Sequence, residues 1–178
     1  MAAKRKVETM AAKRKVNQHA PAIFLDMDGS IADLYGVKGW LEALQSENVS
    51  PYAEAQPLCD MAALRQVLIK LRRQNYIIGV ISWSSKTGSS AFHHAVRKAK
   101  LEWLRKHKLL DLCSHIHIQK YGTSKSAIAR RHTILSSSTI LVDDEAQNRI
   151  EWRAHNGIAI NPKEGNVVEK LRAFIDER

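Results

Sequence analysis

The sequence has few cysteines and no long apolar run, and each shortage excludes a class of protein. Cys59 and Cys113 are the two cysteines among 178 residues, too few to staple a chain of this size and not at metal-ligand spacing. Apolar runs such as residues 76–81 are far shorter than the ~18 residues that span a bilayer, and the N-terminus lacks an apolar signal-peptide core. We therefore expect an intracellular, cytoplasmic protein.

The overall composition is that of one ordinary globular domain. Hydrophobic residues make up 44% of the chain and charged residues 26%, a balance that excludes a disordered or fibrous protein. The length suits one domain with its own core and is too short for two. We predict a single domain over residues 21–178, preceded by a basic tail over residues 1–20.

The predicted tail contains a tandem repeat, MAAKRKVET followed by MAAKRKVNQ. Residues 1–16 hold six basic side chains and one acidic one, a net charge of +5 that is half of the formal +10 of the chain. A duplicated start region, an alternative initiation site or a cloning artefact would each produce this pattern. The KRK clusters suit nuclear import or phosphate binding as well as simple solvation, and we expect a solvated, disordered segment.

From residue 22 onward, short apolar runs alternate with helical patterns, which is typical of βαβ units around a parallel sheet. The predicted strands cover residues 22–25, 76–81, 115–118, 139–142 and 157–160. The predicted helices run from an Asp60 N-cap to Asn75, over about 90–108, from a Thr123 or Ser124 cap, through Arg149 and Trp152, and over 167–175. The sequence therefore predicts an α/β fold with a doubly wound look.

The helix over 90–108 is expected to be amphipathic. An apolar stripe should face the core while the lysines and arginines face water; the stripe consists of Phe92, Val96, Ala99, Trp103 and Leu104. Adjacent helical residues point in different directions, so we expect His93 and His94 to be surface residues. His115 and His117 share one face of a short strand, which allows either a metal site or, more simply, ordinary surface histidines.

Chemistry-bearing side chains follow the predicted strands at one edge of the sheet. Carboxylates gathered at neighbouring strand ends repel one another unless a divalent cation neutralises them, so the pattern predicts Mg²⁺. A lysine in the first turn of a helix is unfavourable unless an anion lies opposite, so a phosphate between the metal and Lys125 would balance the charges. The gathered residues are Asp26, Asp28, Ser82, Lys125, Asp143 and Asp144.

In this order the residues resemble the four motifs of the haloacid dehalogenase-like (HAD) phosphohydrolase superfamily. The motifs are Asp26-Met27-Asp28-Gly29-Ser30, Ser82, Lys125 and Asp143-Asp144. The resemblance covers roughly residues 22–162. It implies a Rossmann-like, three-layer core with a parallel central sheet, an aspartyl-phosphate intermediate and dependence on Mg²⁺.

The resemblance also implies a role for each residue. Asp26 is the implied nucleophile and Asp28 the implied general acid and base. Ser82 would donate a hydrogen bond to a phosphoryl oxygen, and Lys125 would balance the charge of the transition state. The implied metal ligands are Asp26, the backbone carbonyl of Asp28, Asp143 and Asp144.

In this superfamily, large cap domains shield small substrates, but here the insert after the first strand has only about 27 residues, from Asp33 to Cys59. We therefore expect an open site that admits the end of a nucleic acid or a protein as well as a small ester. In this insert Tyr35, Trp40 and Tyr52, with Lys38, would either stack a base or sugar or simply pack the insert.

A second resemblance concerns the stretch Asp143-Asp144-Glu145, Asn148-Arg149 and Trp152-Arg153, which is similar to the 3′-phosphatase domain of polynucleotide kinase-phosphatases. Glu145 departs from that pattern, and the chain has no kinase P-loop. We expect a Mg²⁺-dependent phosphomonoesterase acting on a nucleotide or a nucleic-acid terminal phosphate. The alternatives are a catalytically idle module that binds phosphorylated or nucleic-acid partners, or a phosphatase of sugar phosphates or phosphoproteins.

Overall fold

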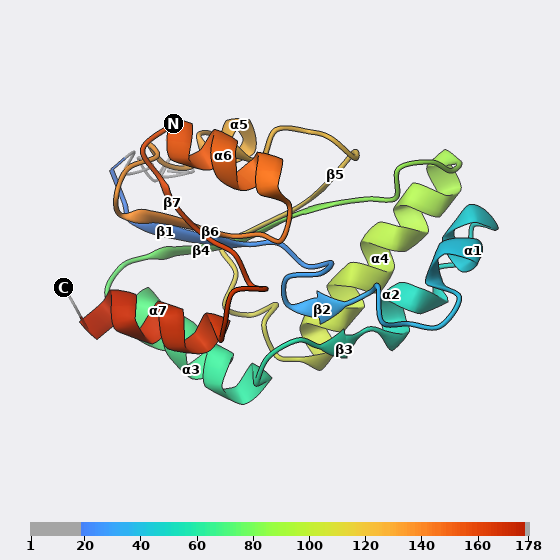
Figure 1. Ribbon diagram of the computed structural model, residues 1–178, viewed down its shortest axis with the longest axis horizontal. Helices are drawn as coiled ribbons and strands as arrows, with labels where there is room; N and C mark the ends of the chain where they lie inside the picture. Colours follow the sequence, from blue (N-terminus) through green and yellow to red (C-terminus); the bar gives the residue numbers. More distant parts are fainter. Residues whose placement is uncertain (1–18, 177–178) are drawn as a thin grey trace, which may run out of the picture.

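The computed structural model describes residues 19–176 and has a central sheet of five parallel strands with helices on both faces (Figure 1). The strand order is β5-β4-β1-β6-β7, so the first strand lies at the centre of the sheet. The strands are β1 (Ala22–Leu25), β4 (Ile77–Trp83), β5 (His115–Gln119), β6 (Thr139–Val142) and β7 (Ile158–Ile160). All residues of β1 and β6 are buried, as expected for strands covered on both faces.

Two layers of helices complete the fold (Figure 1). Helices α3 (Met61–Arg73) and α7 (Val167–Asp176) cover one face of the sheet, and α5 (Lys125–Ala129) and α6 (Ala146–Ala154) cover the other. The larger core lies between the sheet and the α3 and α7 layer. On the opposite face, Phe24 packs edge-on against Trp152 with ring centroids 5.9 Å apart. The predicted three-layer α/β architecture is confirmed.

Helix α3 shows how local sequence fixes an element of this fold. The Asp60 carboxylate accepts hydrogen bonds from the backbone N–H groups of Ala62 and Ala63 at 2.8 and 3.0 Å, which satisfies donors that a helix start otherwise leaves free. At the other end, Asn75 has a φ of 65°, a left-handed conformation that asparagine tolerates and that ends the helix. The predicted boundaries at Asp60 and Asn75 hold.

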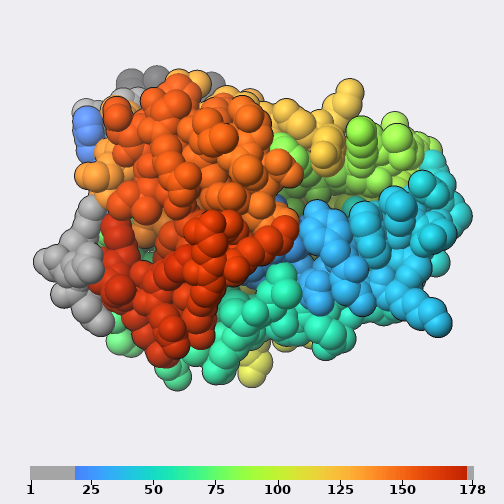
Figure 2. Space-filling view, in the orientation of Figure 1, coloured from blue at the N-terminus to red at the C-terminus, as the bar shows by residue number. Residues whose placement is uncertain are grey.

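The insert after β1 is small, as predicted, but it contains elements that the sequence pattern did not indicate. It is built from β2 (Ala32–Asp33), α1 (Trp40–Gln45), α2 (Ser50–Glu54) and β3 (Gln56–Pro57), with β2 and β3 antiparallel. The insert packs on α4 (Ser90–Lys106), where the Trp103 indole N–H donates to the Ala55 carbonyl at 2.8 Å. In Figure 2 the insert forms the blue and cyan flank beside the orange and red C-terminal half.

Several element boundaries differ by one or two residues from the predicted ones. Helix α4 ends at Lys106 rather than Lys108, because Lys108 has a φ of 56° and leaves the helical conformation. Strand β4 extends to Trp83, so Ser82 lies within the strand rather than after it. No helix among residues 19–176 has both the length and the apolar character needed to cross a bilayer. The repeated tail lies outside the described residues, apart from its last two positions.

Candidate active site

The carboxyl ends of the parallel strands gather the chemistry-bearing side chains at one edge of the sheet. Asp26 and Asp28 follow β1, Asp143 and Asp144 follow β6, and Ser82 lies near the end of β4. Lys125 enters from the start of α5, and its side chain is only 1% exposed. The six side chains that the sequence pattern singled out lie in two adjoining groups, one around each of two buried lysines.

The first group is the Lys125 centre, which comprises Lys125 with Asp26, Asp143 and Asp144. The Lys125 ammonium donates to Asp143 Oδ2 at 2.7 Å and lies 2.9 Å from Asp26 Oδ1. Burial acts to lower the pKa of Lys125, but the two carboxylates outweigh it and raise this pKa above its ordinary value. The lysine is therefore held as a cation between two acids.

The Lys125 centre has more negative than positive charge. One oxygen each from Asp26, Asp143 and Asp144 lies within 4.8 Å of the others. Burial, and after it the charge of Asp26, raises the pKa of Asp143 above its ordinary value despite the contact with Lys125. Asp26 Oδ1 is buried and accepts no hydrogen bond from the described part of the chain, leaving it with the ion pair to Lys125 alone.

These oxygens fit a hard divalent cation such as Mg²⁺, which prefers carboxylate and carbonyl ligands. An ion would give a further ligand contact to the Asp26 oxygen, which has only its ion pair with Lys125, and would offset the excess of carboxylates. Among residues 19–176 this is the one group in which three potential ligand atoms from histidine, cysteine, aspartate or glutamate come so close together. The side chain of Asp28 is not part of it.

Backbone and side-chain contacts hold the acidic residues in place. Asp143 Oδ1 accepts from the Glu145 N–H at 2.8 Å and from the Asn148 amide at 3.2 Å. The Asp144 N–H donates to Ser30 Oγ at 3.0 Å, and Lys163, largely exposed, donates to the Asp144 carboxylate at 2.9 Å. The Asp144 carboxylate is thereby held near the carboxylates of Asp26 and Asp143.

The turn after Asp28 needs a glycine. Gly29 has a φ of +71°, and a Cβ placed on it would lie 2.5 Å from Asp144 Oδ2 and 2.7 Å from the Tyr35 ring. Any side chain here would displace Asp144 as well as strain the backbone. The predicted tight turn is present, and its glycine also makes room for an acidic residue of the Lys125 centre.

The second group is the Lys100 centre, which comprises Lys100 with Asp28, Ser82 and the carbonyl of Trp83. The Lys100 ammonium donates to Asp28 Oδ2 at 2.6 Å, to Ser82 Oγ at 2.9 Å and to the Trp83 carbonyl at 2.7 Å. Burial raises the pKa of Asp28, and the charge of Asp26 adds to this, although Lys100 works in the opposite direction.

The prediction that the lysines of this helix face water is wrong for Lys100. Its side chain is 1% exposed and lies on the buried stripe of α4. The sequence held a signal: Lys100 comes four residues after Val96 and three before Trp103, so a cation interrupts an otherwise apolar helical stripe. A buried lysine needs hydrogen-bond acceptors, and only the fold shows that Asp28 and Ser82 supply them.

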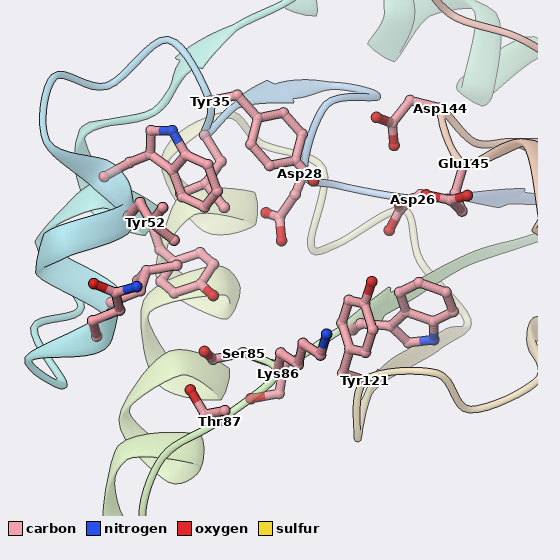
Figure 3. A pocket seen from close by; sticks show the side chains of 17 residues that line it. Asp26, Asp28, Tyr35, Tyr52, Ser85, Lys86, Thr87, Tyr121, Asp144 and Glu145 are labelled. Atoms are coloured by element: carbon pink, nitrogen blue, oxygen red, sulfur yellow. The ribbon is translucent and has the colours of Figure 1, made fainter.

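A pocket of about 520 Å³ opens onto both centres (Figure 3). Asp26, Asp28 and Asp144 lie on its acidic side, with Glu145 beside them. The insert supplies one wall, and the loop after β4 together with Tyr121 supplies the other. The remaining lining residues are Leu34, Tyr35, Trp40, Leu41, Leu44, Gln45, Tyr52, Trp83, Ser84, Ser85, Lys86 and Thr87.

Aromatic side chains face this pocket from both walls. Tyr35 is 48% exposed and packs edge-on against Trp40 at 5.1 Å, whereas Tyr52 is buried in the core of the insert. On the opposite wall, Trp83 and Tyr121 have ring centroids 4.8 Å apart. Tyr52 therefore packs the insert while Tyr35 is accessible. Lys38, expected beside them, is exposed and does not line the pocket.

The histidines divide into two sets. His94 is exposed as expected, but His93 is half-buried, and its Nδ1 lies 2.8 Å from Ser84 Oγ in a hydrogen bond at the pocket wall. On β5, His115 stacks on His132 with ring centroids 3.6 Å apart, and Nε2 of His117 lies 2.8 Å from Nε2 of His132. These three rings form a compact cluster without converging on one metal position.

Comparisons with known proteins bear on the fold. No model of a known protein family matches the chain, and no curated protein matches it in sequence. Among solved structures it is similar to a HAD-superfamily hydrolase from Ehrlichia chaffeensis, with a TM-score of 0.53 and 13% identity over 89% of this chain and 98% of that one. A second similarity, to a chain of the Pnkp1/Rnl/Hen1 complex, has a TM-score of 0.47 and 13% identity over 90% of this chain and 57% of that one. The chain thus has the Rossmann-like fold of the HAD hydrolases.

Proposed function

We propose that this protein is a Mg²⁺-dependent phosphomonoesterase that acts through an aspartyl-phosphate on Asp26. The observation that carries the proposal is the Lys125 centre: a carboxylate at the edge of a pocket, paired with a buried lysine at 2.9 Å and close to two further carboxylates. A nucleophile, a cation for the phosphoryl group and ligands for a metal ion are the groups that phosphoryl transfer to a carboxylate requires.

In the first step, a carboxylate oxygen of Asp26 attacks the phosphorus atom and the bond from phosphorus to the ester oxygen breaks. The protonated Asp28 carboxyl gives its proton to the departing alkoxide, which leaves as an alcohol. Lys125 stays beside Asp26 and offsets the negative charge of the phosphoryl oxygens. Ser82 donates a hydrogen bond to one of these oxygens.

In the second step, the Asp28 carboxylate takes a proton from a water molecule, whose oxygen attacks the phosphorus atom. The bond from phosphorus to Asp26 breaks, inorganic phosphate leaves and the Asp26 carboxylate is restored. Asp26, Asp143, Asp144 and the carbonyl of Asp28 would hold the metal. Bound Mg²⁺ supplies charge neutralisation and orients the phosphoryl group.

The substrate class that the pocket suits best is a nucleotide or the phosphorylated end of a nucleic acid. Tyr35 on one wall and the Trp83–Tyr121 pair on the other offer flat apolar surfaces on which a base could stack. The Lys86 ammonium, 5.8 Å from the centre of the Tyr121 ring, adds a positive charge for a neighbouring phosphate. A sugar phosphate would use the acidic side of the pocket but leave both aromatic walls bare.

The test of the reaction is turnover of p-nitrophenyl phosphate with and without Mg²⁺, beside a panel of nucleotides and 3′-phosphorylated oligonucleotides. We expect phosphate release that requires the metal. A protein that releases no phosphate from any of these esters, yet binds the oligonucleotides, would instead be the idle binding module. Deletion of residues 1–16 should leave the rate on the small ester unchanged.

The test of the substrate class compares a nucleoside 3′-monophosphate with glycerol 2-phosphate in the Tyr35→Ala and Tyr121→Ala variants. Loss of one stacking contact should raise the KM for the nucleotide about tenfold, given roughly 1–3 kcal/mol for each stacked base. The KM for glycerol 2-phosphate should stay unchanged. Lys38→Ala is the matched control, because Lys38 is exposed on the same insert and lies outside the pocket. Equal effects on both substrates would contradict a base-stacking site.

A further inference from the structure

Lys100 is a buried cation to which the mechanism above assigns no task. It comes from the middle of α4, outside the four motifs, and its side chain is 1% exposed. A charged group loses its hydration when buried, and this loss is offset only when the surrounding atoms satisfy it. The position of Lys100 between two residues of the proposed mechanism suggests a use beyond packing.

The contacts of Lys100 show how it can act. An ammonium group has three N–H donors, and those of Lys100 are taken by Asp28 Oδ2, Ser82 Oγ and the Trp83 carbonyl at 2.6, 2.9 and 2.7 Å. The Tyr52 ring lies on another side, its centre 5.0 Å from the nitrogen. Lys100 has no donor left for a substrate phosphate, and so it can act only through the groups it holds.

The effect on Ser82 follows from the hydrogen-bond capacity of a hydroxyl group. Ser82 Oγ accepts from Lys100, so the hydroxyl hydrogen must point away from the ammonium group and remains free to be donated. A phosphoryl oxygen needs such a donor.

The effect on Asp28 is one of orientation. Lys100 engages Oδ2, which restrains the rotation of the carboxyl group and leaves Oδ1 for exchange of protons with the leaving group and with water. The contact to the Trp83 carbonyl ties the same lysine to the backbone of β4. One side chain thus links the ends of β1 and β4.

We infer that Lys100 is a positioning residue that fixes the Asp28 carboxyl and the Ser82 hydroxyl in the arrangement that phosphoryl transfer requires. The inference rests on the proposed function, because both partners have their roles only in that reaction. It assigns to α4 a part in the chemistry in addition to its packing against the insert.

The experiment measures kcat and KM for p-nitrophenyl phosphate with Mg²⁺ in the wild type, Lys100→Met, Lys100→Arg and the control Lys98→Met. Lys98 is exposed on the same helix, so its variant should behave as the wild type. Lys100→Met should lower kcat about 10²-fold, the order of loss expected from a misplaced catalytic group. KM should hardly change, since Lys100 does not reach the substrate. Lys100→Arg should recover part of the loss, because it keeps the charge.

A double-mutant cycle separates positioning from a purely structural role. In a Ser82→Ala background the hydroxyl that Lys100 orients is absent, so Lys100→Met should cost less there than in the wild type, and only the part that acts through Asp28 should remain. Equal fold-losses in both backgrounds, or a wild-type kcat for Lys100→Met, would overturn the inference. Thermal unfolding is followed for every variant, and should Lys100→Met fail to fold, Lys100→Arg carries the same cycle.

The Asp26→Asn variant distinguishes a failure of this inference from a failure of the proposed function. If the wild type shows no metal-dependent turnover, or if the Asp26→Asn variant keeps its turnover, the proposed function and the inference are both overturned. If turnover is lost in the Asp26→Asn variant but kept in the Lys100→Met variant, the inference alone is overturned.

Discussion

Two buried lysines lie at the same edge of the sheet in different charge environments. In the Lys125 centre, one ammonium group contacts Asp26 and Asp143, and the Asp144 carboxylate lies close by. In the Lys100 centre, one ammonium group faces a single carboxylate, that of Asp28, together with two neutral acceptors. The first centre has an excess of negative charge, whereas the second has none.

This difference in charge indicates which of the two centres requires a ligand. Buried carboxylates in excess of their cations raise the free energy of the folded state, and a divalent ion relieves this cost. A group without such an excess, whose donors are all satisfied, requires nothing further and serves to hold its members in place. Adjacent centres can therefore take different parts in one reaction, one binding the reacting groups and the other orienting them.

The largest expected effect is the loss of turnover in Asp26→Asn. The substitution removes the nucleophile, and kcat for p-nitrophenyl phosphate should fall about 10⁴-fold or more. It also removes one charge from a repelling cluster, so the fold should remain intact. Stopped assays give the rate and circular dichroism gives the fold; an unfolded variant would contradict the assignment of Asp26.

The next effect concerns stability and tests the comparison directly. Lys125→Met leaves two contacting carboxylates without their cation and should lower the free energy of unfolding by about 3–5 kcal/mol, the usual cost of breaking a buried ion pair. Lys100→Met should lower the free energy of unfolding by less, because it leaves only one carboxylate, that of Asp28, without its cation. The Asp28 side chain is 17% exposed, so water can partly replace the lost contact. Urea denaturation without Mg²⁺ measures both. A larger cost for Lys100→Met would mean that the two charge environments have been assigned the wrong way round.

Addition of Mg²⁺ should stabilise the wild type, because the ion binds the folded state at the Lys125 centre. At a hundredfold excess over its Kd the gain is about 2.7 kcal/mol, which corresponds to a rise in Tm of roughly 5–10 °C for a chain of this size. Asp144→Asn should reduce this rise, while Glu102→Gln, an exposed acidic control on α4, should not. An equal rise in both variants would argue against Asp144 as a ligand.

The smallest effect extends the comparison to the histidine cluster of His115, His117 and His132, where the neighbouring charge is that of Arg97 and Arg131. Burial, and after it the two other histidines and Arg131, lowers the pKa of His132 from 6.5 to about 4. A lowered histidine pKa means that the unfolded chain binds the proton more readily, so stability is complete above about pH 6.5 and is lost as the pH falls toward 4.

The His132→Gln variant should therefore lose less in Tm than the wild type between about pH 7.5 and about pH 5. His94→Gln, at an exposed position, serves as the control and should follow the wild type. Equal losses in His132→Gln and the wild type would show that carboxylates alone set the acid sensitivity.

Much of the fold could be predicted because its signals are local. The run 22–25 is apolar throughout and becomes β1, and Asp60 and Asn75 bound a helix because their side-chain chemistry suits its two ends. The insert could not be predicted in this way. Its helices α1 and α2 have six and five residues, too short to form alone, so they depend on packing against α4.

The residues of the candidate site likewise divide into those with a local sequence signal and those placed by packing alone. The motif residues around Lys125 could be singled out because each follows or begins an element of the predicted sheet. Lys86 and Tyr121 could not, because their approach to the pocket depends on how two loops pack in three dimensions. For Lys100 the sequence showed only a cation on an apolar helical stripe, and the fold supplied its acceptors. The roles of all these residues remain proposals that the variants above will test.

The sequence alone determined that carboxylates, a hydroxyl and a lysine would meet at one edge of a parallel sheet. They do so because polar residues follow its apolar runs, and parallel strands all point the same way. Only the tertiary structure decided which charges touch. Periodicity places a side chain on a face of its element, but whether a charge on that face can be buried depends on the acceptors that a distant segment brings to it, as Asp28 and Ser82 are brought to Lys100.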